Sequence, residues 1–103
     1  MTVTLPALGR SRDRAQCVTD SFERMRERLA DHEERHATLA IEGARLIAVA
    51  LGEIPERESC EDLRRAWADA GRRELSAMNA RQAQYDAATG HGLSEGVKLE
   101  PCP

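Results

Sequence analysis

The sequence predicts an all-α protein: an antiparallel hairpin of two long, coiled-coil-like helices that assembles as a dimeric helical bundle. Apolar residues recur at alternating spacings of three and four along the first half of the chain, and a short glycine- and proline-containing segment separates this half from a second helical stretch. Aromatic residues make up only 3% of the 103 residues. A chain of this size and composition supports one thin core, so oligomerisation is an expected way to bury more surface.

The first helix is expected over residues 12–52, after an irregular arm of residues 1–10. Pro6 and Gly9 interrupt helical structure in the arm, and Ser11 is a suitable N-cap. From residue 15 onward, one stripe has the heptad spacing of a helix that packs against another at a shallow angle. The stripe comprises Ala15, Val18, Phe22, Met25, Leu29, His32, His36, Leu39, Gly43, Leu46 and Ala50.

The second half of this helix is apolar on several sides, because Ile41, Ile47 and Leu51 lie off the stripe. A helix that is apolar on most of its circumference needs more than one neighbour to cover it. We therefore expect a homodimer, with either a parallel or an antiparallel arrangement of the subunits. The residues expected in the dimer or partner interface are Phe22, Met25, Leu39, Ile41, Leu46, Ile47, Leu51, Ile54 and Trp67.

The second helix is expected over residues 60–89, so that residues 11–89 form the hairpin domain. Gly52 and Pro55 end the first helix, and Ser59 followed by Asp62 resembles a capping box at the start of the second. Gly90 ends this helix. Residues 90–103 are expected to form a mobile tail, because Pro101 and Pro103 oppose regular structure.

Charge and cysteine content exclude several classes of protein. The chain has 15 basic and 18 acidic residues, a net charge of −3, so direct binding of nucleic acid is not expected. Cys17, Cys60 and Cys102 are odd in number and lack a metal-ligand spacing, which indicates a reduced, intracellular chain. The most apolar window, residues 37–51, is too short for a membrane span. We therefore predict a soluble, cytoplasmic protein.

The segment His32-Glu33-Glu34-Arg35-His36 matches the HExxH pattern of zinc peptidases. Two histidines one turn apart can share a zinc ion, and the glutamate between them can activate a bound water molecule. Zinc peptidases usually have uncharged residues at the two variable positions, which are charged here. The sequence also predicts no sheet to form a substrate cleft, and both histidines lie on the stripe that faces another helix.

The same segment contains Glu33-x-x-His36, the spacing of ferritin-like di-iron sites. The stretch EERHATLAIE resembles the metal-binding helix of minimal two-helix ferritin-like proteins, which implies a metal-binding bundle. A di-iron centre also needs glutamates from other helices, and Glu74 is the candidate near the stripe of the second helix.

We interpret His32 and His36 mainly as polar residues of the stripe that fix helix register, with a possible sensitivity of assembly to pH. On this interpretation the protein has no catalytic residue, no cofactor and no metal. The candidate metal ligands that stay open are His32, Glu33 and His36.

In size, acidity and two-helix organisation, the chain resembles small bacterial anti-activators that sequester LuxR-type quorum-sensing receptors, and small phage-encoded inhibitors. The resemblance implies a non-enzymatic regulatory protein that inhibits another protein, such as a transcription regulator, by covering its functional surface. The apolar surface around Ile41, Ile47, Leu51 and Ile54, or the arm residues Val3, Leu5 and Leu8, would make this contact. A metal-binding helical bundle and a structural coiled-coil component are the alternatives.

Overall fold

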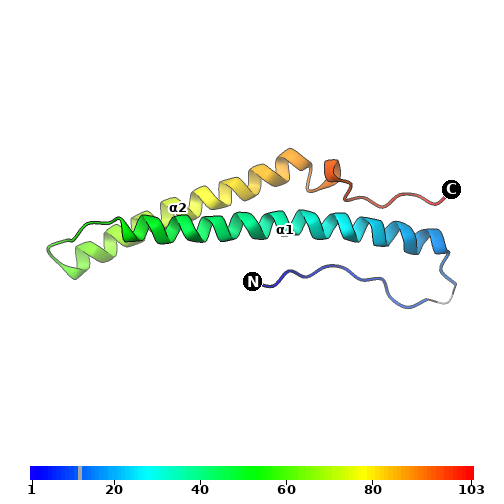
Figure 1. Ribbon diagram of the computed structural model, residues 1–103, viewed down its shortest axis with the longest axis horizontal. Helices are drawn as coiled ribbons and strands as arrows, with labels where there is room; N and C mark the ends of the chain where they lie inside the picture. Colours follow the sequence, from blue (N-terminus) through cyan, green and yellow to red (C-terminus); the bar gives the residue numbers. More distant parts are fainter. Residues whose placement is uncertain (12) are drawn as a thin grey trace. The chain divides into compact units, whose positions relative to one another are not determined.

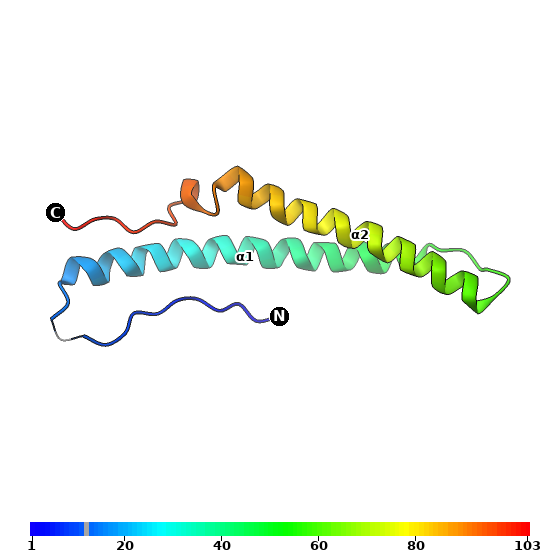
Figure 2. The ribbon, with the colours of Figure 1, turned by 180° about the vertical axis from the view of Figure 1, so that it is seen from behind.

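The computed structural model describes residues 1–11 and 13–103. These residues form helix α1 (Gln16–Gly52), helix α2 (Cys60–Thr89) and the short 3-10 helix η1 (Leu93–Glu95), with no strand among them (Figures 1 and 2). The predicted all-α helical hairpin is confirmed. The expected start of the first helix, at about residue 12, lies outside the described residues, and α1 runs from Gln16.

Local chemistry explains how α2 begins. The Ser59 hydroxyl accepts a hydrogen bond from the backbone N–H of Asp62 over 3.1 Å, which satisfies a donor that has no partner inside the helix. Glu61 and Asp62 lie in the first turn, where negative charge is favourable. Among the described residues, no helix is long and apolar enough to cross a membrane.

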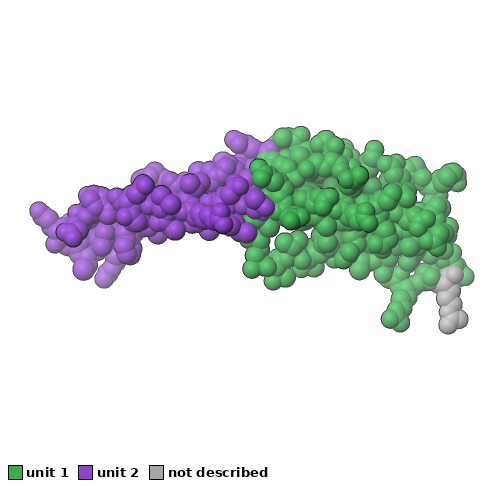
Figure 3. Space-filling view, viewed as in Figure 1, with its two compact units in different colours: residues 1–37, 85–103 green, residues 38–84 purple. Residues whose placement is uncertain are grey.

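The chain divides into two compact units (Figure 3). The first unit contains residues 1–37 and 85–103, and the second contains residues 38–84. The first unit therefore combines the N-terminal arm, the start of α1, the end of α2 and the C-terminal segment.

In the second unit, α1 and α2 approach closely where α1 has a glycine. A Cβ atom added at Gly43 would overlap the Met78 side chain and lie 3.0 Å from its Cβ. Leu39 and Ala70 are buried, whereas Trp67 is 47% exposed and Val49 is 54% exposed. Three of the residues expected in an interface, Ile41, Leu46 and Trp67, are thus open to solvent in the single chain.

In the first unit, the C-terminal segment is attached to the start of α1. The Ser21 hydroxyl donates to the Glu100 carbonyl and accepts from the Glu100 N–H, both over 2.8 Å. A disulfide joins Cys17 to Cys102, with 5.7 Å between the Cα atoms. The expectation of a reduced chain is wrong for these two cysteines, because folding brings together residues 85 positions apart. Cys60 is a free, exposed thiol.

Candidate metal site

Two histidines of α1 define the site, and all of its residues belong to the first unit. His32 and His36 are one helical turn apart, so their side chains project from the same face of α1. Tyr85 and Asp86 come from the last turn of α2, and Glu95 comes from η1. His32 is only 3% exposed and His36 is 19% exposed, so the two imidazoles are largely shielded from water, whereas Asp86 and Glu95 are 30% and 37% exposed.

The two imidazoles converge on one carboxylate oxygen. Oδ1 of Asp86 lies 3.0 Å from Nε2 of His32 and 2.7 Å from Nε2 of His36. On its other side, Nδ1 of His32 lies 2.6 Å from Oε1 of Glu95. His32 is thus held between two carboxylates, one on each ring nitrogen.

Tyr85 packs against both histidines. Its ring is stacked on that of His32 at a centroid distance of 4.8 Å and meets that of His36 edge-on at 5.0 Å. The Tyr85 hydroxyl donates a 2.6 Å hydrogen bond to Oε2 of Glu95. Glu95 therefore ties the tyrosine hydroxyl and the His32 ring together through its two oxygens.

A tight turn after α2 brings Glu95 back toward α1. Gly90, Gly92 and Gly96 have positive φ angles, a conformation that glycine adopts without strain, and His91 is a non-glycine residue in the same region. A Cβ atom at Gly92 would lie 3.0 Å from Cβ of Val97 and 3.3 Å from Cγ of His32. A side chain at residue 92 would therefore displace His32 or the turn that carries Glu95.

Hydrogen bonding keeps both carboxylates ionised. The hydrogen bond from His36, followed by that from His32, lowers the pKa of Asp86 against the opposing effect of burial. The hydrogen bonds from the Tyr85 hydroxyl and from His32 lower the pKa of Glu95. Burial and the interaction with Glu95 raise the pKa of Tyr85 to about 12, so the phenol stays protonated.

The contacts of His32 with two ionised carboxylates require a positive charge on its ring or beside it. Ionised carboxylates only accept hydrogen bonds, so Nδ1 of His32 must carry a proton toward Glu95. A neutral His32 then presents the lone pair of Nε2 to Oδ1 of Asp86, and two acceptors 3.0 Å apart repel each other. Either a second proton on His32 or a cation between the three atoms removes this repulsion.

The three inner atoms are suitable ligands for a metal ion. His32, His36 and Asp86 offer one ligand atom each, all within 4.8 Å of one another. Ligands at 2.0–2.2 Å from a tetrahedral zinc ion are about 3.3 Å apart. To hold zinc, the two oxygen–nitrogen pairs, at 2.7 and 3.0 Å, would have to open by up to about 0.6 Å, and separations of up to 4.8 Å within the cluster would have to close by up to about 1.5 Å. Glu95 would then be the outer carboxylate that orients a metal-bound histidine.

The structure brings together some of the residues singled out in the sequence and leaves others apart. His32 and His36 meet, and Glu33 follows His32 as a half-buried residue of α1. Glu74 belongs to the second unit and is not among the clustered ligands. Sequence reasoning missed Asp86, Glu95 and Tyr85. The available signal was the antiparallel hairpin, which returns the second helix along residues 32–36, although the expected helix bounds do not single out Asp86 as the residue that faces them.

The comparisons with known proteins add a family. No curated protein and no solved structure matches the chain significantly. The profile of a family described as "Bacterial protein of unknown function (DUF922)" matches residues 1–92, which is most of the chain and includes His32, His36 and Asp86. The chain therefore belongs to the DUF922 family of bacterial proteins.

Proposed function

We propose that the protein binds one zinc ion at His32, His36 and Asp86, and that this site is the centre of a metal-dependent hydrolase of the HExxH peptidase type. The observation that carries the proposal is the convergence of Nε2 of both histidines on a single oxygen of Asp86. A metal ion bound by these three atoms would account for their convergence without the second proton on His32 that the cluster otherwise requires.

The ligand set supports zinc and a catalytic role. Two imidazole nitrogens and one carboxylate oxygen form the ligand type found in hydrolytic zinc sites, which leave a fourth position for water or substrate. A di-iron centre is less well supported. It needs several bridging glutamates, and the metal-ligating cluster among the described residues contains one carboxylate.

The residues of the chain suit hydrolysis of an amide bond. A bound zinc ion lowers the pKa of a water molecule and polarises a carbonyl group. Glu33 would take a proton from the water molecule as its oxygen bonds to the carbonyl carbon, and would deliver that proton to the leaving nitrogen as the C–N bond breaks. Glu95 would hold the tautomer of His32 that presents Nε2 to the metal.

Metal content tests the site directly. Protein dialysed against zinc should retain one ion per chain by mass spectrometry, and His36→Ala or Asp86→Asn should reduce this below about a tenth. His91→Ala is the matched control, because its ring lies 3.7 Å from the other oxygen of Asp86 but is 84% exposed. A wild-type chain that retains no zinc, and whose melting temperature is unchanged by a chelator, would contradict the proposal.

Catalysis needs a separate experiment. The zinc-loaded chain should hydrolyse an unfolded protein such as casein, and Glu33→Gln should keep its zinc and lose at least 100-fold in rate, since general base catalysis contributes about that much or more. Glu34→Gln, at the exposed neighbouring position, should stay active. Full activity of Glu33→Gln would exclude this mechanism.

A second candidate function is the regulatory, protein-binding role expected from the sequence. The exposed large apolar residues of the second unit favour it, because apolar side chains that are open to solvent in a single chain can be buried by a protein partner. If the protein inhibits a transcription regulator, a pull-down should recover that regulator, and Ile41→Asp should abolish recovery while the fold is kept. Recovery that is unaffected by Ile41→Asp would exclude this surface.

The disulfide bears on where the protein works. Disulfides persist in oxidising compartments and are rare in the cytosol. The bond between Cys17 and Cys102 therefore favours a location outside the reducing cytoplasm over the cytoplasmic location expected from the sequence. Such a location also favours the hydrolase over the inhibitor of an intracellular regulator.

A further inference from the structure

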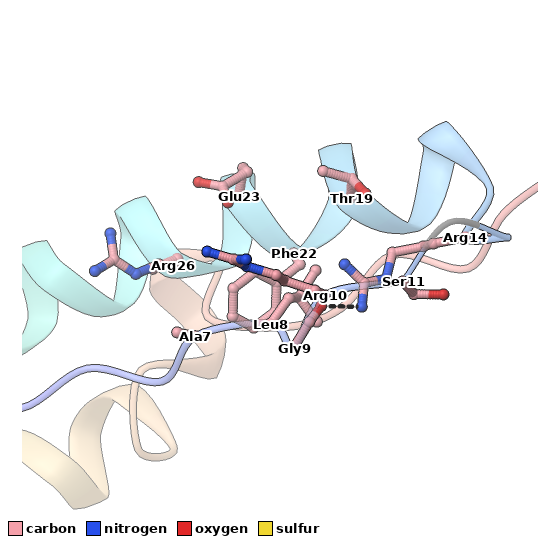
Figure 4. A pocket seen from close by; sticks show the side chains of 10 residues that line it. All are labelled: Ala7, Leu8, Gly9, Arg10, Ser11, Arg14, Thr19, Phe22, Glu23 and Arg26. Carbon is pink, nitrogen blue, oxygen red and sulfur yellow. Dashed lines mark hydrogen bonds between the residues drawn. The ribbon is translucent and has the colours of Figure 1, made fainter.

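A groove runs between the N-terminal arm and the first turns of α1, and its walls lie within the first unit. Residues 7–11 and Arg14 form one wall, and residues of α1 between Thr19 and Arg26 form the other (Figure 4). Its volume is about 490 Å³. Phe22, which is 8% exposed, and the half-buried Leu8 provide apolar lining. We name this feature the arginine groove.

The arginine groove is locally basic in an acidic chain. Arg10, Arg14 and Arg26 line it, against one carboxylate, Glu23. The whole chain carries a net charge of −3, so this positive site is a local feature. Figure 4 shows Arg14 and Arg26 toward opposite ends of the groove, with Phe22 and Leu8 between them.

Two of these arginines also hold the arm in place. Nε of Arg26 donates to the Pro6 carbonyl over 3.1 Å, and Nη2 of Arg14 donates to the Gly9 carbonyl. A guanidinium has five N–H donors, so both keep donors for a ligand. Arg10 makes no hydrogen bond or ion pair with any other residue of the ranges 1–11 and 13–103, so within them its guanidinium donors are not engaged.

We infer that the arginine groove binds an acidic peptide segment, with carboxylates on the guanidinium groups and an apolar side chain against Phe22 and Leu8. Arginine is well suited to carboxylates because its planar fork can make two parallel hydrogen bonds. The apolar lining favours a peptide over a bare inorganic anion.

The position of the groove makes it a substrate subsite, an assignment that rests on the proposed hydrolase function. Arg26 precedes His32 by six residues and His36 by ten, or about 9–15 Å along the helix axis. An extended peptide covers this distance in about three to five residues. Arg26 also lies about 80–120° around the helix from the two histidines, so a substrate that reaches both places must pass partly around α1. The preferred substrate therefore has an acidic residue at least three to five positions from the bond that is cleaved.

Binding to the metal-free chain tests the groove separately from the metal site. Isothermal titration calorimetry would compare two blocked pentapeptides, one of alternating glutamate and leucine and one with glutamine in place of glutamate. The glutamate peptide should bind at least tenfold more tightly, and its affinity should fall as salt is raised. Equal affinities, or displacement by inorganic phosphate at the same concentration as by the peptide, would overturn the inference.

Arg10 provides the informative variants, because its substitution removes no hydrogen bond of the described structure. Arg10→Gln should weaken the glutamate peptide at least fivefold, and Arg10→Glu should reverse the preference toward a lysine–leucine peptide. Arg64→Gln, an exposed arginine of α2, is the matched control and should bind as the wild type does. Far-ultraviolet circular dichroism would establish that each variant is folded, and unchanged binding by Arg10→Gln would overturn the inference.

The contribution of the arginine groove to catalysis is measured separately, as kcat/KM. In the zinc-loaded chain, kcat/KM for a peptide with glutamate four residues from the cleaved bond should exceed that of its glutamine counterpart, and Arg10→Gln should remove the difference. A chain that binds zinc and cleaves both peptides equally would overturn the subsite and leave the hydrolase intact. A chain that binds the glutamate peptide but no zinc would overturn the hydrolase and the subsite, and leave the groove intact.

Discussion

At the scale of single residues, Glu95 is partly exposed to solvent and still contacts several side chains of the candidate metal site. Its side chain is 37% exposed, yet its two oxygens contact His32 and Tyr85, two of the three rings of the candidate metal site. A carboxylate in this position fixes which nitrogen of a histidine is free to bind a metal ion. The residue therefore affects the site without being a ligand.

Glu95→Gln should lower zinc affinity 10- to 100-fold without abolishing zinc binding, because loss of an outer carboxylate typically has an effect of this size. Competition against a chromogenic zinc chelator measures the change. Glu100→Gln is a matched control, since Glu100 uses its backbone to contact Ser21. An unchanged affinity in Glu95→Gln would show that His32 is oriented by α1 alone.

The sequence predicted half of this site. His32 and His36 share one turn of a helix, so their pairing is a local property that spacing alone reveals. Asp86 and Glu95 reach them across 50 to 63 residues, and the route of Glu95 depends on a turn with positive φ angles that spacing does not reveal. The interpretation of the histidines as register-fixing residues identified the face correctly but not the carboxylates opposite it.

At the scale of the elements, heptad spacing and turn chemistry predicted two long helices, because these signals are local and repeat along the chain. The same spacing placed Leu46 on the packed stripe, yet Leu46 is 44% exposed. A two-helix contact covers only a narrow strip of each helix, so further stripe positions stay open to solvent.

The contact between the helices can be tested with a pair of glycines in the second unit. Gly43→Ala should destabilise the chain by about 1–3 kcal/mol, because the added methyl group overlaps Met78. Gly71→Ala meets no atom within 4 Å and should stabilise the chain by up to about 1 kcal/mol through helix propensity. Urea unfolding measures both.

Met78→Ala would remove the side chain that the added methyl group overlaps. In the Met78→Ala background, Gly43→Ala should therefore lower the free energy of unfolding by less than it does in the wild type. If Gly43→Ala were as stable as Gly71→Ala, the close approach of the helices at this point would be disproved.

At the scale of the whole molecule, the disulfide closes nearly the entire chain into one loop. Cys17 and Cys102 are 85 residues apart, and a loop of this length restricts the unfolded state by about 4–5 kcal/mol in the chain-entropy description. The three cysteines gave no such signal in the sequence, because pairing depends on the return of the C-terminal segment to the start of α1.

Reduction, or the double variant Cys17→Ser, Cys102→Ser, should therefore lower the urea midpoint substantially. Cys60→Ser should leave it unchanged, because Cys60 is exposed and unpaired. A midpoint that does not respond to reduction would show that the bond is absent in solution.

Dimerisation is the remaining expectation at this scale. Light scattering should give twice 11.4 kDa at micromolar concentration if the exposed apolar residues of the second unit pair with those of another copy. Ile41→Asp should return the mass to that of a single chain. A wild-type mass of 11.4 kDa would exclude the homodimer.

The exposed thiol of Cys60 complicates how such a mass is interpreted. An accessible cysteine in a chain that already holds an oxidised pair can cross-link with its counterpart in another molecule during storage in air, and can exchange with the existing bond. Two chains tethered in this way would scatter light like an associated pair although their apolar faces never touch. The oligomeric state is therefore best measured on the Cys60→Ser chain, in which any doubling of mass comes from non-covalent contact.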